Sequence, residues 1–270
     1  MRRTTSNERT AVLKRILGNT AHCRRIVGAL GVFLLMGVAS LAAAVNPIED
    51  ALNTADRLAG DKARDASRRP AEVLAFFGVK PGMRVLDLFS GGGYYTELMA
   101  RAVGETGWVV AHNNDAYLAF SRATLQTRYA KGRLGNVRRQ VSEGDDLVLP
   151  NDYFDFVMMA LTYHDLYFVG DNWPAIDAER LLREVYESLR PGGIVGIIDH
   201  VAPAGTGYEA AQRLHRIDPA LIEGGMRTIG FDLDGTSDVL VNPDDPLDIP
   251  MFDPAIRGKT HRTVMRFRKP

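Results

Sequence analysis

The chain has 270 residues, of which 46% are hydrophobic and 24% charged, and its 33 basic and 33 acidic side chains cancel. This composition is typical of a globular protein and excludes a disordered, collagen-like or multi-span membrane chain. The neutral total conceals an asymmetry, because residues 1–44 hold seven bases and one acid, and the remainder has six more acids than bases. The acidic remainder lacks a global electrostatic footprint for nucleic acid, although a local basic patch would be compatible with it, so we expect no nucleic-acid partner.

Residues 26–45 form an uncharged apolar run that follows Arg24 and Arg25 and contains the small residues Ala42, Ala43 and Ala44. This pattern predicts a secretory signal peptide cleaved after Ala44. The alternative is an uncleaved membrane anchor, since about 20 apolar residues can span a bilayer. Both interpretations place the rest of the chain outside the cytoplasm, as a periplasmic, secreted or anchored protein whose only membrane contact is this segment. The arginine pair lacks the surroundings typical of a twin-arginine signal.

Residues 45–69 are charged and helical in character, and we expect them to be a lead-in to one α/β domain over residues 70–270. Pro70 suits the first turn of a helix through Phe77, and Gly78 is a natural stop. The single cysteine, Cys23, lies before this part of the chain. The domain therefore has no cysteine for a disulfide, a nucleophile or a metal ligand.

Residues 84–89 (RVLDLF) have the length and apolar character of a buried strand, and residues 94–103 have the spacing of a helix. Between them lie Ser90 and three glycines, so the pattern predicts the first strand–turn–helix unit of a doubly wound sheet, with its ligand site at the carboxyl end of the strand. Asp87 stands just before the glycines. A carboxylate there would repel a pyrophosphate and suits a cationic or amino-bearing ligand.

Residues 85–93 (VLDLFSGGG) resemble the first motif of the class I S-adenosylmethionine-dependent methyltransferases, V-L-D-x-G-x-G-x-G, with Phe89 in place of the first glycine. The resemblance implies a Rossmann-like, doubly wound α/β fold with a seven-stranded sheet whose final strand is antiparallel. It also implies S-adenosyl-L-methionine as the cofactor. The residues that it places at the donor are Asp87, Phe89, Ser90, Gly91 and Gly93.

The resemblance continues along residues 70–200 in the family's order. Residues 107–113 look like the second strand, and Asn113 stands where the family has an acid that meets the ribose, with Asp115 as a substitute. Residues 136–141 look like the third strand. Asp145 then matches the acid that meets the adenine amino group, whereas without the resemblance it would be a solvated turn residue. If Asn113 meets the ribose, replacing it with Asp should tighten donor binding.

Residues 155–161 form a continuous apolar run that is typical of a central strand buried on both faces. Directly after it come Tyr163, His164 and Asp165, where many members of the family carry a substrate-facing loop. We expect His164 to act as a general base, with Tyr163 or Asp165 orienting it or the substrate. The alternative for His164 is a structural anchor to the backbone.

Residues 179–189 show helical spacing, and the sequence Arg-Pro-Gly-Gly at 190–193 resembles the family's turn into the strand 194–198. Asp199 and His200 end that strand and should point into the same crevice as His164. Residues 212–223 predict one helix. Residues 230–234 and 263–268 predict the two closing strands, and residues 242–259 between them predict a lid or substrate-recognition loop.

A narrower resemblance rests on the segments FSGGGYYTE, TYHD, LHRID and FDPAIRGKTHR, which look like exported, uncharacterised bacterial proteins predicted to be methyltransferases. The leading hypothesis is therefore a methyltransferase whose acceptor, of unknown identity, is deprotonated by His164 or His200. A second is a fold that binds a nucleoside or a partner without catalysis, as Phe89 and Asn113 would allow. A third hypothesis is a metal-dependent enzyme. The sequence has no short metal-binding signature, so we assign no metal ligands. The residues that such an enzyme could use are His164, Asp165, Asp199, His200, His215 and Asp218.

Overall fold

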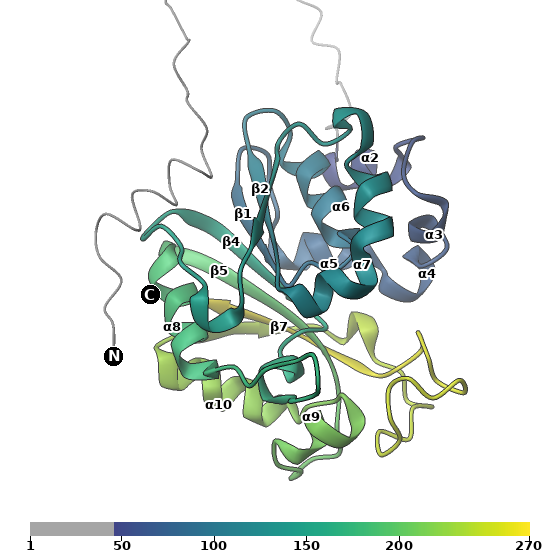
Figure 1. Ribbon diagram of the computed structural model, residues 1–270, viewed down its shortest axis with the longest axis vertical. Helices are drawn as coiled ribbons and strands as arrows, with labels where there is room; N and C mark the ends of the chain where they lie inside the picture. Colours follow the sequence, from purple (N-terminus) through teal and green to yellow (C-terminus); the bar gives the residue numbers. More distant parts are fainter. Residues whose placement is uncertain (1–45) are drawn as a thin grey trace, which may run out of the picture.

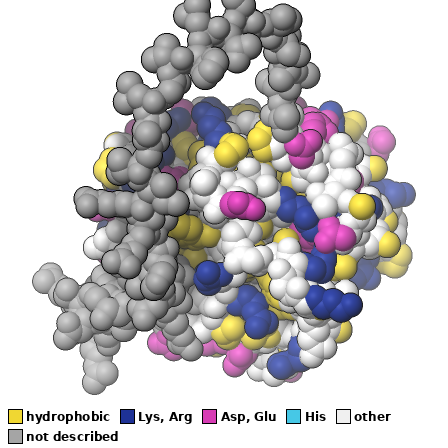
Figure 2. Space-filling model, turned by 90° about the horizontal axis from the view of Figure 1, so that it is seen from above, with side chains coloured by type: hydrophobic (Ala, Val, Ile, Leu, Met, Phe, Trp, Pro, Cys, Tyr) yellow, Lys and Arg dark blue, Asp and Glu magenta, His cyan; other side chains and the backbone are white. Residues whose placement is uncertain are grey.

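The computed structural model describes residues 46–270 of the chain (Figure 1). The predicted signal peptide or anchor lies outside the described residues. Within the described part, no helix is both long enough and apolar enough to cross a membrane. The face seen in Figure 2 carries basic and acidic side chains side by side, together with scattered apolar ones.

A seven-stranded sheet with the order β3-β2-β1-β4-β5-β7-β6 forms the centre of the molecule. The first five strands run parallel, β7 is antiparallel to β5, and β6 is antiparallel to β7. This order confirms the predicted fold class, including the antiparallel final strand. The strands are β1 (Arg84–Leu88), β2 (Trp108–Asn113), β3 (Val137–Val141), β4 (Phe154–Ala160), β5 (Leu189–His200), β6 (Asp232–Thr236) and β7 (Arg262–Arg268).

Helices cover both faces of the sheet, as the continuous burial of its central strands requires. In β1, Val85 packs in the apolar cluster on one face and Leu86 in the cluster on the other. On the first face lie α2 (Pro47–Asn53), α5 (Pro70–Phe77) and α6 (Tyr94–Val103); on the second lie α8 (Ala178–Ser188) and α10 (Pro219–Ile229). The remaining helices are α3 (Ala59–Lys62), α4 (Asp65–Arg68), α7 (Asp115–Arg128) and α9 (Glu209–Leu214).

The lead-in residues form three short helices, α2 to α4, that are joined to the domain by a buried ion-pair network. Arg128 of α7 is fully buried and contacts Asp61 of α3 at 2.7 Å and Glu97 of α6 at 2.5 Å. Because a buried guanidinium without partners is costly, these contacts fix the lead-in against α6 and α7.

The predicted single helix over residues 212–223 is wrong, because the chain breaks between α9 and α10. His215 adopts a left-handed conformation, with φ 49°, directly after α9. Pro219 then disfavours helical geometry at the residue before it, and Asp218 caps α10 by accepting a hydrogen bond from the Ala220 amide at 2.9 Å. The break brings His215 to the carboxyl edge of the sheet.

Two element bounds also differ from the sequence prediction. The strand expected over 230–234 begins at Asp232, because Gly230, with φ 115°, ends α10. The strand expected at 194 extends back to Leu189 through the predicted turn. The segment 242–259 has no helix or strand and is anchored by Asp245, which accepts two hydrogen bonds from the buried guanidinium of Arg216.

Candidate functional site

The loop after β1 has the backbone conformation that the glycine motif demands. Gly91 and Gly93 adopt positive φ values of 54° and 77°, which glycine reaches without steric cost. The loop is held by hydrogen bonds from the Ser90 amide to the His112 carbonyl and from the Gly93 amide to the Ser90 carbonyl. Gly93 leads directly into α6, so the first turn of that helix faces the end of β1.

Phe89, which replaces the first glycine of the motif, keeps the conformation of a glycine, with φ 51°. Its side chain is buried, and its ring stacks on Tyr117 with 5.4 Å between centroids and lies 5.1 Å from the ring of His112. An aromatic residue in the left-handed region is strained by about 1–3 kcal/mol. The aromatic packing and burial offset that strain, so Phe89 is a wall of the site as well as part of its turn.

Asp87 is buried at the end of β1 and accepts a hydrogen bond from the Thr96 hydroxyl at 2.5 Å. Burial raises the pKa of its carboxyl to about 7, although the Thr96 hydrogen bond and the charges of Arg128 and Arg68 oppose the shift. A carboxyl with such a pKa ionises near neutral pH, and a cationic ligand would favour its charged form.

A cavity of about 210 Å³ opens beside Asp87 and the glycine loop. Its lining combines the acid with two guanidinium groups from the lead-in, Arg64 and Arg68, and with aromatic rings. The other lining residues are Phe89, Ser90, Gly91, Gly92, Tyr94, Tyr95, Tyr117, Phe120, Ala160 and Leu161. The predicted donor residues Asp87, Phe89, Ser90 and Gly91 thus meet at one cavity, and Gly93 supports it from the turn.

Asn113 is buried at the end of β2, where its amide group holds the glycine loop. Its Oδ1 accepts a hydrogen bond from the Gly91 amide at 2.8 Å, and its Nδ2 donates to the Ser90 hydroxyl and the Gly91 carbonyl, each at 3.1 Å. The contacts that the structure gives Asn113 are thus structural, and its role toward a ribose stays a prediction.

Asp145 and Asp115 lie farther along the same edge of the sheet and do not line the cavity. Asp145 accepts a hydrogen bond from the Asp177 amide at 2.8 Å. Asp115 begins α7, and its amide donates to Glu143. The adenine contact of Asp145 also stays a prediction.

Behind the cavity lies a buried cluster that combines residues from three segments, namely Asp199 at the end of β5, His164 and Asp165 after β4, and His215 after α9. His164 Nδ1 lies 2.6 Å from Asp199 Oδ1, and its Nε2 lies 3.3 Å from Asp165 Oδ1. His215 Nδ1 lies 3.7 Å from the same Asp165 oxygen. We refer to these four residues as the histidine–aspartate cluster.

The charges in the cluster shift the pKa values of its members. Burial disfavours the imidazolium of His164, but the carboxylates of Asp199 and Asp165 outweigh burial and raise its pKa to about 9. Burial likewise opposes the charge on Asp165, but His164, His215 and the Tyr117 hydroxyl hold its pKa below the usual value. The two carboxylates therefore favour a positive charge beside them.

Tyr117 joins the cluster to the cavity. Its ring lines the cavity and stacks on Phe89, and its hydroxyl donates a hydrogen bond to Asp165 Oδ2 at 2.6 Å. A group bound against Phe89 and Tyr117 would therefore be connected to Asp165 through the Tyr117 side chain.

His200 and Tyr163 lie on two sides of His164. His200 is buried, its ring centroid is 5.9 Å from that of His164, and its Nδ1 lies 2.7 Å from the Thr260 hydroxyl. Burial and the neighbouring positive charges lower its pKa well below the usual value, so it is neutral. Tyr163 is part of the apolar core, and its ring lies 6.0 Å from that of Tyr167.

Comparison with known proteins identifies the domain. Residues 85–193 match a family described as "Methyltransferase domain". Solved structures of S-adenosylmethionine-dependent methyltransferases from Aquifex aeolicus and Mesorhizobium loti share the fold, with TM-scores of 0.55 and 0.50 at 24% and 19% identity. They cover 77% and 76% of this chain and 96% and 100% of their own. Residues 85–193 are therefore similar to a methyltransferase domain, and the described residues have the fold of these methyltransferases.

Curated relatives of this chain include the "Ubiquinone/menaquinone biosynthesis C-methyltransferase UbiE" proteins of two bacteria. The Vibrio vulnificus (strain YJ016) protein is 32% identical over 127 residues, which cover 47% of this chain and 44% of that protein. The Serratia proteamaculans (strain 568) protein is 32% identical over 138 residues, covering 49% and 50%. The chain thus spans about half the length of these relatives.

Several residues of the site were not predicted from the sequence. Arg64 and Arg68 lie in the lead-in, where nothing in a charged helical pattern distinguishes a site residue from a solvated one. Tyr117 lies on α7, to which no role was assigned. From the sequence, His215 was a candidate only for the metal-enzyme alternative. Its position depends on the break after α9, which the residue pattern does not predict.

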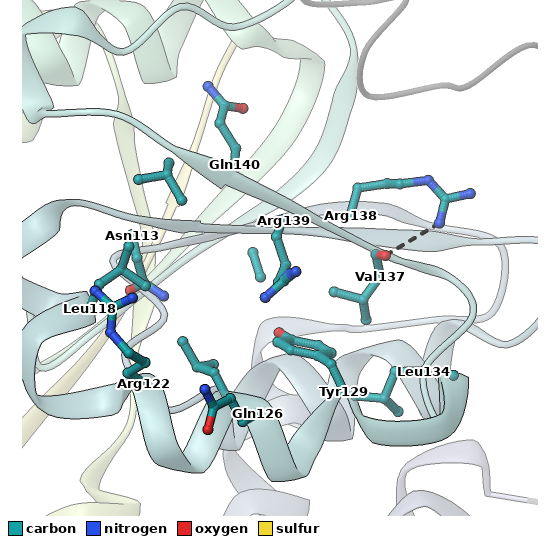
Figure 3. A pocket seen from close by; sticks show the side chains of 14 residues that line it. Asn113, Leu118, Arg122, Gln126, Tyr129, Leu134, Val137, Arg138, Arg139 and Gln140 are labelled. Atoms are coloured by element: carbon teal, nitrogen blue, oxygen red, sulfur yellow. Dashed lines mark hydrogen bonds between the residues drawn. The ribbon is translucent and has the colours of Figure 1, made fainter.

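A larger cavity, about 660 Å³, lies between α7 and the edge strand β3 (Figure 3). Arg122 and Gln126 project into it from α7, and Arg139 lies opposite, above the ring of Tyr129. Asn113 is the one lining residue that also contacts the glycine loop. This cavity contains neither Asp87 nor any member of the histidine–aspartate cluster.

Proposed function

We propose that the protein is an S-adenosylmethionine-dependent methyltransferase that acts on an acceptor outside the cytoplasm. The observation that carries the proposal is the cavity that places Asp87, the glycine loop and two arginines together at the carboxyl end of β1. The fold puts ligands at this edge of the sheet.

The charges in the cavity fit the amino-acid end of the donor, which carries an ammonium group and a carboxylate. Asp87 supplies the anion for the ammonium, and Arg68, whose charge acts on Asp87, supplies a cation for the carboxylate. Arg68 has no carboxylate partner within residues 46–270 and lies 4.6 Å from the ring centroid of Tyr94. A volume of about 210 Å³ suits this end of the donor better than the whole nucleoside.

When bound, S-adenosylmethionine supplies a methyl group already activated by the positive sulfur. The residues of this chain then have to position the acceptor and remove its proton. We assign proton removal to His200, because its Nε2 has no hydrogen-bond partner among the described residues. Both imidazole nitrogens of His164 face carboxylates, those of Asp199 and Asp165, which makes it a weaker candidate for the base.

The names of the relatives do not identify the acceptor of this protein. The printed names of the curated relatives assign them to ubiquinone and menaquinone biosynthesis, but the family match ends at residue 193. The segments that flank the histidine–aspartate cluster on its other side, α9, α10 and residues 242–259, lie beyond that point. They are therefore the part of the chain in which acceptor specificity resides.

The location outside the cytoplasm is supported by residues 1–45, with their basic start, apolar run and Ala42-Ala43-Ala44. Cell fractionation and the intact mass of the protein test it. Recovery outside the cytoplasm with loss of residues 1–44 supports cleavage, and recovery in the membrane with full mass supports an anchor. A full-length protein in the cytoplasm would contradict the location.

Methyl transfer is tested by following S-adenosylhomocysteine formation when the protein is incubated with S-adenosylmethionine and cell-envelope extract. Asp87→Ala should abolish product formation, whereas Asp146→Ala, which removes an exposed acid outside the cavity, should leave it unchanged. Donor binding without any turnover would contradict catalysis and favour the nucleoside-binding alternative.

A further inference from the structure

The histidine–aspartate cluster contains the ligand set of a metal centre. His164 Nε2, Asp165 Oδ1 and His215 Nδ1 come from two separate segments, and one ligand atom from each residue lies within 4.8 Å of the others. Two imidazole nitrogens and one carboxylate oxygen are the protein ligands of many catalytic zinc sites and of non-haem iron sites. We propose that these three residues bind a divalent transition-metal ion.

The distances between the ligand atoms are close to those that a metal requires. Ligands about 2.1 Å from a tetrahedral ion are about 3.4 Å from one another. Asp165 Oδ1 lies 3.3 Å from His164 Nε2 and 3.7 Å from His215 Nδ1. The ligand atoms of His164 and His215 lie within 4.8 Å of each other, and a rotation of His215, the least buried of the three, would bring them closer.

Each buried ligand is oriented by a second hydrogen bond. Asp199 Oδ1 lies 2.6 Å from His164 Nδ1, which leaves Nε2 as the atom that faces Asp165. The Tyr117 hydroxyl donates to Asp165 Oδ2 and leaves Oδ1 for the ion. Carboxylate–histidine–metal arrangements of this kind are usual around protein metal ions.

The charge balance also favours a cation. Asp165 and Asp199 are both buried, and within residues 46–270 their ion pairs are with histidines only. Asp199 otherwise accepts hydrogen bonds from the amides of His164 and His200. Two buried carboxylates without an arginine or lysine partner are stabilised by a bound cation.

The backbone of His215 supports a ligand role. It is a non-glycine residue with φ 49°, a strained conformation that functional sites often retain. Its side chain is 22% exposed, compared with 2% for His164, so an ion and a further ligand can enter from this side. Phe168 and Phe252 border His215, with ring centroids 4.3 and 4.9 Å away, and give that entrance an apolar lining.

The test uses Zn²⁺ and Co²⁺ with the untagged full chain, by isothermal titration and by metal analysis after dialysis. We expect one ion per chain. His215→Ala, at a partly exposed position, should weaken binding at least 100-fold, and Asp199→Asn, which removes the charge that supports the His164 imidazole, should weaken it 10- to 100-fold. His261→Ala is the matched control, because it removes a histidine outside the cluster and should change nothing.

Circular dichroism of each variant establishes that the fold is kept. No stoichiometric binding to the unaltered chain would overturn the proposal. So would binding that His215→Ala leaves within threefold of the original, since the ion would then be held elsewhere, for example by His22 and Cys23. Because the readout is metal binding itself, the result does not depend on whether the protein transfers methyl groups.

Discussion

Phe89 shows how one residue can depart from a motif without changing the loop that the motif builds. The backbone keeps the positive φ of the glycine that the motif normally has there. Burying a phenylalanine side chain stabilises a fold by about 1.5–3 kcal/mol, which is comparable to the cost of the strained φ. The ring is therefore retained at little net cost, and it supplies the stacking surface for Tyr117.

The raised pKa of Asp87 predicts that donor binding depends on pH near neutrality. The ammonium of the donor binds the ionised carboxyl, and the pKa of about 7 means that this form is lost as the pH falls. The dissociation constant should rise about tenfold per pH unit below 7 and level off above it. Isothermal titration between pH 5.5 and 8.5 measures this, and Asp87→Asn should remove the dependence. A flat profile for the unaltered protein would contradict the assignment.

The raised pKa of Asp87 affects folding stability in the opposite direction from donor binding as the pH rises. Because the pKa of Asp87 is higher in the folded protein than its ordinary value of 3.8, the folded state favours the protonated carboxyl. Its contribution to stability is most favourable below pH 3.8 and decreases as the pH rises toward 7. Donor binding offsets this loss at neutral pH by supplying a cation.

Asn113→Asp should destabilise the protein and weaken donor binding, which reverses the expectation from the motif alone. The substitution removes two donated hydrogen bonds and sets a carboxylate against the Gly91 carbonyl. We expect a loss of about 1–3 kcal/mol in the free energy of unfolding. Urea unfolding and donor titration measure both effects. Tighter donor binding at unchanged stability would restore the ribose assignment.

At the scale of elements, the parts of the chain with strong local signals were predicted. The strand–glycine–helix unit at residues 84–103 and the apolar run of β4 stand where the sequence placed them. The break at His215 was not predicted, because residues 212–223 show helical spacing. Pro219 within them is compatible with the first turn of a new helix as well as with the end of the preceding one. The residue types of the histidine–aspartate cluster could be recognised in the sequence. Which of them lie together depends on this break and on the pairing of β5 with β4.

Asp218 is the residue that fixes the break, so Asp218→Ala should destabilise the start of α10. Its carboxylate accepts hydrogen bonds from the Ala220 amide at 2.9 Å and the Gly205 amide at 2.7 Å. Losing a cap of this kind costs about 0.5–2 kcal/mol, and the second bond adds to it. Thermal unfolding should show the loss, and Asp238→Ala, at an exposed position after β6, is a control. An unchanged melting temperature would contradict the role of Asp218.

At the scale of the whole molecule, the lead-in is part of the site rather than a linker, since it supplies Arg64 and Arg68 to the cavity. The pairs of Arg128 with Asp61 and Glu97 hold it in place. Arg128→Ala removes the fully buried partner of Asp61 and Glu97, which keep ion pairs only with the more exposed Arg64, Arg101 and Arg133, and should cost about 1.5–3 kcal/mol of unfolding free energy. Urea unfolding measures this, with Arg183→Ala on the exposed face of α8 as the control. A loss below 1 kcal/mol would show that the network does not hold the lead-in.

The central claim is that the cavity beside Asp87 binds the methyl donor. Isothermal titration of the purified protein with S-adenosylmethionine and S-adenosylhomocysteine tests it most directly. We expect both to bind at one site per chain, because the amino-acid end that meets Asp87 and Arg68 is the same in the two molecules. No binding of either would mean that the class I fold has been kept without its donor site.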